Sequence, residues 1–366
     1  MKRQYLSMRQ AICIIVVYIC GSSVVLGGNS EAGQDSWISV ILSQIIVIPM
    51  ILIYAKIITL FPEKNIFEVT EILFGKIAGK IFTVLITWYA LHLGALVLRN
   101  FSEFVETTAM PETPQLALMI VMILVTTYMA RSGAEVLGKW SLVSLVIIVS
   151  IMFLTIILLY NRLDMNHFLP VMEHSTKTIL TGSYELFTFP FVETVLFLTL
   201  ADSVKKEDSP FKIYVLGEVL GALIMLIVAL RNVAALGSAM LETEMFPSYS
   251  AARIISISDF LARVEGFIST NFILGGITKI SLCLLAASKG LASLFNIQDC
   301  KKLTLPVSLS MLALCSVLFQ NTMEMITFLD IYKVYAIPFQ IVIPVMIWIG
   351  GEMKARVKEG TAEKPA

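Results

Sequence analysis

The sequence predicts an all-α polytopic membrane protein with ten transmembrane helices. Hydrophobic residues make up 57% of its 366 residues. Charged residues make up only 15%, where a soluble domain carries about 25%. The mean hydropathy of +0.84 is typical of a chain that faces lipid over much of its surface. This composition excludes an ordinary soluble enzyme, and a formal charge of zero gives no basic field for a nucleic-acid partner.

The ten predicted helices are the apolar stretches long enough to cross a bilayer. The first follows Lys2, Arg3 and Arg9, as in a signal peptide, but nine further stretches come after it and its small residues lie mid-stretch. We therefore expect it to be retained, in one transmembrane domain over 1–366. The stretches are residues 10–30, 37–61, 80–100, 114–130, 140–160, 182–201, 212–234, 266–290, 303–320 and 330–350.

The orientation follows from the Lys and Arg residues in the connections. Nineteen of them lie on the side of the N-terminus, seven lie on the opposite side, and Lys279 lies within a span. Because cytoplasmic loops are enriched in Lys and Arg, both termini are predicted to be cytoplasmic, with a short cytoplasmic tail at 352–366.

The ten spans also suggest an internal symmetry of five plus five, with halves at about 8–178 and 179–351. Five crossings invert the direction of the chain, so the second half starts from the opposite side. Spans one and six open the two halves, and both have centres poorly suited to an unbroken helix. This pattern predicts an inverted-repeat transporter fold with discontinuous helices 1 and 6.

In span one, Gly21, Ser22 and Ser23 lie near the middle of the membrane. An unwound turn here would expose backbone N–H groups, which favour an anion such as a carboxylate. The alternative is close helix packing through small residues, which is common in membranes. The residues leave both interpretations open.

In span six, Pro190 and Glu193 lie near the middle of an apolar run. Proline leaves a backbone carbonyl free to accept a hydrogen bond from an ammonium group, and Glu193 adds a negative charge where charge is costly. The alternative is a simple proline kink, with Glu193 paired to another helix. The parallel with span one favours a binding site.

Two other spans carry polar residues in the membrane. In span eight, Lys279 shares a helical face with Asn271. Lys279 is a candidate for pairing with Glu193 or for lying against span one, and a structural ion pair is the alternative. In span three, His92 and Tyr89 share a face that would line a central cavity, although a lone histidine is more often a packing group.

No catalytic constellation is present in the sequence. It has three histidines, no closely spaced Cys/His set, no phosphate-binding glycine loop and no nucleophile elbow. We therefore expect no enzyme activity, cofactor or metal. Among the connections, 63–80 predicts an interfacial helix and 237–265 predicts a long outer segment that acts as a lid or a docking surface.

Five short stretches, taken in order and spacing, resemble a known family. The chain is similar to the permease-like B subunit of the spore germination (germinant) receptors of endospore-forming bacteria, within the amino acid, polyamine and organocation transporter superfamily. The stretches are Gly21-Ser22-Ser23, Gly33-Gln34-Asp35-Ser36-Trp37-Ile38-Ser39, Gly75-Lys76-Ile77-Ala78-Gly79-Lys80, Phe189-Pro190-Phe191-Val192-Glu193, and Phe246-Pro247-Ser248 through Arg253, Phe260 and Arg263.

The resemblance implies the LeuT-like fold of ten spans in the spore inner membrane. It implies a subunit that senses a small germinant, an amino acid or sugar, in a cavity between helices 1, 3, 6 and 8. The expected partners are an A subunit and a lipoprotein C subunit. By position, the backbone around Gly21, Ser22 and Ser23 would bind the ligand carboxylate. The backbone around Phe189, Pro190 and Phe191 would bind its ammonium group.

The chain departs from the wider superfamily in two places, which keeps other functions open. Gly21 is followed by two serines where many transporters have a second glycine, and span five lacks the lysine that couples protons in some relatives. One alternative function is a secondary amino-acid transporter driven by a proton or sodium gradient. Another is a scaffold or ion-conducting subunit with a vestigial cavity.

Overall fold

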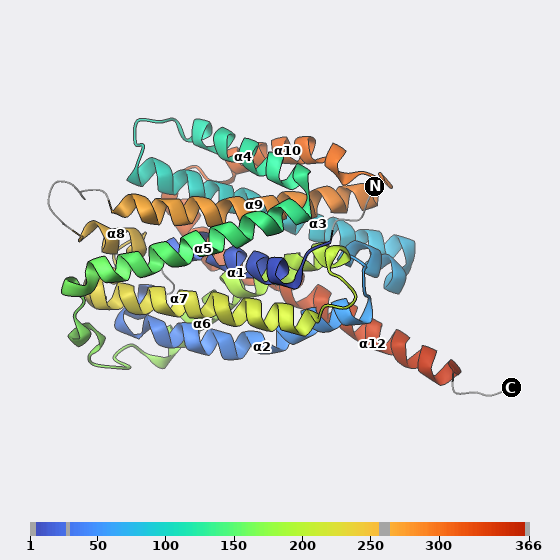
Figure 1. Cartoon of the computed structure of the whole chain (residues 1–366), viewed down its shortest axis with the longest axis horizontal. Coiled ribbons are helices and arrows are strands. Elements are labelled where there is room, and N and C mark those ends of the chain that lie inside the picture. The colour runs from blue at the N-terminus through green and yellow to red at the C-terminus, as the bar shows by residue number, and fades with distance from the viewer. Residues whose placement is uncertain (1–4, 27–29, 256–263, 363–366) are drawn as a thin grey trace.

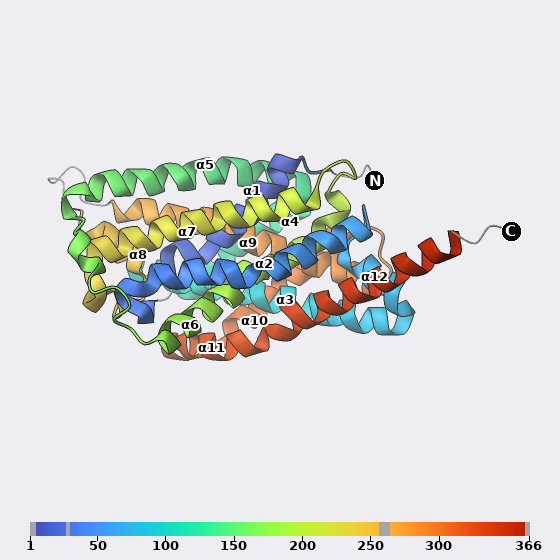
Figure 2. The same cartoon turned by 90° about the horizontal axis from the view of Figure 1, so that it is seen from below.

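The computed structural model describes residues 5–26, 30–255 and 264–362, and the helices of this part form one elongated bundle. The long helices run roughly parallel to one axis, and the first and last described helices reach the same end of the bundle (Figures 1 and 2). The described part contains no β-strand, only an isolated parallel bridge between Leu6 and Val204. The all-helical fold class is confirmed.

The helices occupy the ranges that hydropathy predicts. Eight described helices are long and apolar enough to cross a membrane, and two shorter apolar helices, Met8–Gly21 and Thr304–Leu318, correspond to predicted spans one and nine. The α-helices are α1 (Met8–Leu26), α2 (Ser36–Leu60), α3 (Ile66–Thr108), α4 (Gln115–Ser132), α5 (Ala134–Leu159), α6 (Thr176–Leu186), α7 (Pro210–Leu241), α8 (Pro247–Arg253), α9 (Glu265–Leu294), α10 (Thr304–Leu318), α11 (Thr322–Tyr335) and α12 (Ile343–Ala362). The shorter elements are η1 (Ser30–Asp35), η2 (Tyr160–Arg162), η3 (Met165–Phe168), η4 (Phe187–Phe191), η5 (Val192–Ser203), η7 (Cys300–Lys302) and η8 (Pro338–Val342).

The outer faces of the bundle are apolar. Ile45 of α2, Val121 of α4 and Val146 of α5 are each exposed by 60% or more. Water would solvate these side chains poorly, whereas lipid chains solvate them well. The exposed apolar faces therefore agree with an integral membrane protein.

Span one lacks the interruption that the sequence predicts at Gly21–Ser23, because α1 is helical from Met8 to Leu26. Gly21 instead packs closely against Gly275 of α9, where an added Cβ on Gly275 would lie 2.7 Å from the Gly21 Cα. Two backbones approach this closely only where neither carries a side chain. The small residue at position 21 thus serves helix packing, which is the alternative that the sequence left open.

Span six contains the predicted break. The helix α6 ends at Leu186 and is followed by the π-helical turn η4, in which Phe189 is extended, with φ −144° and ψ 111°. Pro190 has no N–H to continue the helical ladder. The chain then resumes as the 3₁₀-helix η5, so that Glu193 lies just past the break.

The last span also contains a break that the sequence analysis missed. The predicted stretch 330–350 is divided among three elements: the end of α11, the π-helical turn η8 that begins at Pro338, and the start of α12. Helix α12 continues past the end of the bundle (Figure 2). The break places Gln340 inside the protein, where it is fully buried.

The interfacial helix predicted near residues 63–80 is the first part of α3. Asn65 and Glu68 form a reciprocal capping box at its start. Gly75, with φ +75°, bends the chain before the spanning part of α3 begins. Lys354 of α12 donates to the carbonyl of Ile72 (3.0 Å), so the last helix rests on this first part of α3.

Candidate functional site

A buried ion pair lies at the centre of the bundle. Glu193 of η5 and Lys279 of α9 form a salt bridge, and neither side chain is accessible to solvent. An isolated charge inside a membrane protein is costly, and pairing offsets most of that cost. The interrupted span six and helix α9 are therefore joined at the level of the break.

Three further residues extend this pair into a hydrogen-bonded network. The Tyr332 hydroxyl donates to Glu193 and lies 3.0 Å from the hydroxyl of Tyr89. The amide nitrogen of Gln340 donates to the Tyr89 hydroxyl and to the carbonyl of Thr188, both at 2.8 Å. The network therefore connects α3, α11 and the two interrupted segments η4 and η8, and Glu193 is its only charged acceptor.

The ammonium group of Lys279 also lies between two aromatic rings. It is 4.4 Å from the ring centroid of Phe189 and 5.1 Å from that of Tyr18. Such cation–π contacts stabilise a desolvated cation. An added Cβ on Gly21 would lie 3.0 Å from the Lys279 Cδ, so a larger residue at position 21 would displace the lysine stem.

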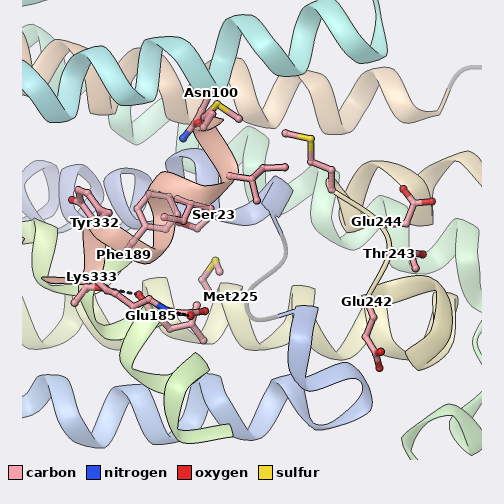
Figure 3. Close-up of a pocket in the computed structure, with 16 residues that line it drawn as sticks. Ser23, Asn100, Glu185, Phe189, Met225, Glu242, Thr243, Glu244, Tyr332 and Lys333 are labelled. Carbon is pink, nitrogen blue, oxygen red and sulfur yellow. Dashed lines mark hydrogen bonds and ion pairs between the residues drawn. The ribbon is translucent and has the colours of Figure 1, made fainter. Parts of the chain in front are cut away.

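A cavity of about 400 Å³ lies next to this network. Ser23, Phe189 and Tyr332 line its inner part, and Figure 3 shows these three side chains gathered together. Toward the mouth, Lys333 forms an ion pair with Glu185 at 2.6 Å (Figure 3). Phe189 and Tyr332 both line the cavity and contact the buried pair, so they connect the two.

The walls of the cavity come from more elements than the sequence predicts. Ser23 of α1 and Asn100 of α3 contribute, and span six contributes Glu185, Leu186, Thr188 and Phe189. Further walls come from Met225 of α7, from the connection 242–245 and from α11. Helix α9, the predicted span eight, contributes Lys279 behind the Phe189 ring and no residue to the lining.

The opposite end of the bundle is held closed by polar contacts. Lys289 of α9 pairs with Asp202 at 2.7 Å and donates to the carbonyl of Thr199 at 3.0 Å. The backbone N–H of Leu6 donates to the carbonyl of Ser203 at 2.8 Å. The cavity is therefore accessible from the end that carries 242–245, while polar contacts close the end that carries Leu6 and Asp202.

Most of the sequence-predicted site residues gather at this centre. Gly21, Tyr89, Phe189, Glu193 and Lys279 belong to the network or its packing, as described above. Ser23 lines the cavity, and its buried hydroxyl has no hydrogen-bond partner in the described structure. Pro190 and Phe191 are buried within the break, and the side chain of Ser22 lies outside the described residues.

His92 and Asn271 lie elsewhere. The His92 ring stacks on Trp88 at 5.5 Å and meets the edge of Tyr335 at 5.1 Å, so it packs between α3 and α11. Asn271 is buried in α9. Neither residue lines the cavity. In the predicted outer segment the structure contains α8, while Phe260 and Arg263 lie outside the described residues.

The sequence analysis missed Tyr332, Gln340 and Lys333, which all belong to the last span. A signal was present, because Pro338 lies inside that span as Pro190 lies inside span six. Tyrosine and glutamine are uncharged, so neither stands out as a charged residue within an apolar stretch does. Only the fold brings them to Glu193.

Comparison with known proteins identifies the family of this chain. Residues 5–325 match the Spore_permease family, described as spore germination protein. The chain belongs to this family. It is 26% identical to spore germination protein KB of Bacillus subtilis (strain 168) over 364 residues, 98% of each chain. It is also 26% identical to the putative spore germination protein YfkT of the same strain over 325 residues, 89% of each chain.

Two solved structures share the fold. The crystal structure of MhsT in complex with L-phenylalanine aligns with a TM-score of 0.63 and 11% identity, covering 94% of this chain and 89% of MhsT. Mhp1, a nucleobase-cation-symport-1 family transporter in a closed conformation with bromovinylhydantoin bound, aligns with a TM-score of 0.64 and 13% identity, covering 93% of this chain and 78% of Mhp1. The chain is thus a permease-like integral membrane protein of the germination family with a LeuT-like transporter fold, and not an enzyme.

Proposed function

We propose that this chain is the germinant-sensing membrane subunit of a spore germination receptor. A small nutrient, an amino acid or a sugar, binds in the 400 Å³ cavity and shifts the equilibrium between two conformations. Partner subunits, an A subunit and a lipoprotein C subunit, convert this shift into germination. The receptor lies in the spore inner membrane with both termini of this chain in the cytoplasm.

The position of Tyr332 is the observation that carries this proposal. Its side chain lines the cavity, while its hydroxyl donates to the sealed Glu193. A ligand with a hydrogen-bond acceptor beside Tyr332 competes with Glu193 for this proton. Weakening that bond raises the cost of keeping Glu193 buried, so binding favours a conformation in which the Glu193–Lys279 contact is rearranged.

The cavity also supports assignments for the ends of the ligand. The unpartnered hydroxyl of Ser23 is available to a ligand carboxylate or hydroxyl group. Because α1 is helical here, its backbone donors at Gly21 and Ser22 become available only in a state in which α1 unwinds. The backbone around Phe189, Pro190 and Phe191 receives the ammonium group, since the break frees carbonyls there.

Two substitutions on one helix test the site. Leu329 lines the cavity, whereas Ile331 of the same helix does not and is 58% exposed. We expect Leu329→Trp to abolish saturable binding of a panel of radiolabelled amino acids and hexoses to purified protein in liposomes. Ile331→Trp serves as the matched control and keeps binding. Equal binding by both variants and the wild type would place the ligand outside this cavity.

The fold supports a second function, a secondary transporter driven by a proton or sodium gradient. The similarity to the transporter Mhp1 is the observation that favours it. Counterflow of the bound compound in the same liposomes separates the two functions. Saturable binding without counterflow supports a sensor, and counterflow that Leu329→Trp abolishes supports a transporter.

A further inference from the structure

A second buried carboxylate, Glu218 of α7, lies outside the site described above. Its side chain is 3% exposed, and neither of its carboxylate oxygens has a hydrogen-bond partner in the described structure. None of the described salt bridges includes it. It therefore differs from Glu193, whose charge is compensated by a lysine and a tyrosine.

The surroundings of Glu218 are uncharged. The amide of Gln44 in α2 faces it without the geometry of a hydrogen bond. Tyr214 lies one turn earlier on the same helix, and its ring lies 5.8 Å from that of Tyr54 in α2. Toward α1 the helix presents glycines, since the atoms nearest to an added Cβ at Gly217 and Gly221 belong to the side chains of Ile15 and Ile19.

The position of Glu218 makes an ionised state costly. Glu218 lies two turns inside α7, which is long and apolar enough to cross a membrane, and so lies within a membrane-spanning helix and not in a connection. A carboxylate without a countercharge at this position is strongly disfavoured unless it takes up a proton or a cation. A metal ion needs several oxygen ligands and room for itself, whereas none of the described cavities is lined by Glu218. A proton needs neither.

Tyr214, one turn before Glu218, and its ring neighbour Tyr54 both contact the segment that carries Glu193. The hydroxyl of Tyr54 donates to the carbonyl of Gln340 at 2.5 Å and also lies 3.3 Å from the carbonyl of Val192. The hydroxyl of Tyr214 donates to the carbonyl of Thr194 at 3.3 Å. The carbonyls of Val192 and Thr194 flank Glu193, and Gln340 belongs to the hydrogen-bonded network around it. A neutral Glu218 leaves these hydrogen bonds in place, whereas an ionised Glu218 competes for the hydroxyl protons because a carboxylate is the stronger acceptor.

We propose that Glu218 is a proton-binding site that is occupied in this conformation and coupled to the Glu193 segment through the two tyrosines. When the proton leaves for water, the carboxylate draws the tyrosine hydroxyls away from the carbonyls at 192 and 194. The backbone that carries Glu193 is then loosened. Proton binding at Glu218 thus stabilises the sealed state of the Glu193–Lys279 pair.

Infrared spectroscopy of the purified protein in lipid nanodiscs tests the proton directly. A protonated carboxylic acid has a C=O stretch that a carboxylate lacks, and we expect Glu218→Gln to remove this band at neutral pH. Glu103→Gln is the matched control, because Glu103 is equally buried but pairs with Arg99 and accepts a hydrogen bond from Gln115 at 2.8 Å. The control leaves the band unchanged.

Two outcomes of this measurement would overturn the proposal. One is a wild-type spectrum at neutral pH that matches that of Glu218→Gln. The other is a carboxylate band that responds to Na⁺ or K⁺ at constant pH in the wild type but not in the variant, since that would make Glu218 a metal-cation site. Titration of the wild type alone keeps the test available if the variant does not fold. The acid band is then present at neutral pH and disappears as the pH is raised.

Hydrogen exchange tests the coupling. Amides at 192–196 of the wild type should exchange faster as the pH rises through the infrared transition, after correction for intrinsic base catalysis. In Glu218→Gln this additional acceleration is lost, and in Tyr54→Phe it is reduced. The same pH profile in all three proteins would show that Glu218 is not coupled to the Glu193 segment. No germinant is needed, so a negative result here is independent of the proposed sensing function.

Discussion

Span six carries two Glu–Lys pairs that differ in their access to water. Glu193–Lys279 lies just past the break, with both side chains fully buried. Glu185–Lys333 lies just before it, at the mouth of the cavity, with side-chain exposures of 33% and 17%. Lys333 also contacts Asp330 at 2.8 Å, whereas the ammonium group of Lys279 lies over the rings of Tyr18 and Phe189 besides its carboxylate partner.

This difference separates the roles of the two pairs. Removing one partner of a buried pair leaves a desolvated charge, and the cost is large. A pair at the mouth of a cavity is screened by water and salt, and it contributes little to stability. The inner pair therefore determines which conformation is stable. The outer pair affects what enters the cavity.

The substitution Lys279→Met should have the largest effect. It leaves Glu193 buried without a countercharge, at a cost of about 3–5 kcal/mol in the free energy of unfolding. We expect a sharp loss of folded protein and a lower thermal unfolding temperature in detergent. Unfolding monitored by circular dichroism measures this loss.

The double variant Glu193→Gln with Lys279→Met is the control for this first prediction. It removes both charges and keeps side chains of similar size, so most of the lost stability should return. A single variant as stable as the wild type would mean that the buried pair does not determine stability. A double variant no better than the single one would assign the effect to packing of the lysine stem.

The sequence predicts the two residues of the inner pair and offers their pairing as one of two positions for Lys279, but it does not reveal the outer pair. Lys279 and Glu193 stand out because each is a charged residue within an apolar stretch. The break in span six is also predictable, because Pro190 cannot continue a helix. In contrast, Gly21–Ser23 has two physical uses, unwinding and close packing. Only the contact of Gly21 with Gly275 decides for packing in this conformation.

The role of the last span is the part that the sequence does not reveal. Tyr332 donates to Glu193 because η8 interrupts the last span and α11 lines the cavity. This placement depends on tertiary packing. The sequence also does not single out Glu218, because its lack of a hydrogen-bond partner depends on which residues of other helices surround it. Periodicity and hydropathy describe one helix at a time, so contacts between distant helices lie beyond them.

The substitution Tyr332→Phe should have an intermediate effect. It removes the hydrogen bond to Glu193 but keeps the ring, and loss of a donor to a buried charge costs about 1–3 kcal/mol. Thermal unfolding should therefore occur between the wild type and Lys279→Met. Tyr335→Phe, one turn further along, is the matched control, because the Tyr335 hydroxyl makes no hydrogen bond in the described structure. If both variants lowered the unfolding temperature equally, the hydrogen bond from Tyr332 to Glu193 would not account for the loss.

The substitution Lys333→Ala should have the smallest effect on stability. The pair with Glu185 is partly exposed, so its loss costs about 0–1 kcal/mol and less at high salt. Its effect should appear in ligand binding instead, because Lys333 and Glu185 line the mouth of the cavity. Unfolding temperatures at low and high salt, together with binding of the radiolabelled panel, measure the two effects. A loss of stability as large as that of Lys279→Met, and independent of salt, would show that the outer pair is as inaccessible to solvent as the inner one. The two pairs would then not differ in their roles.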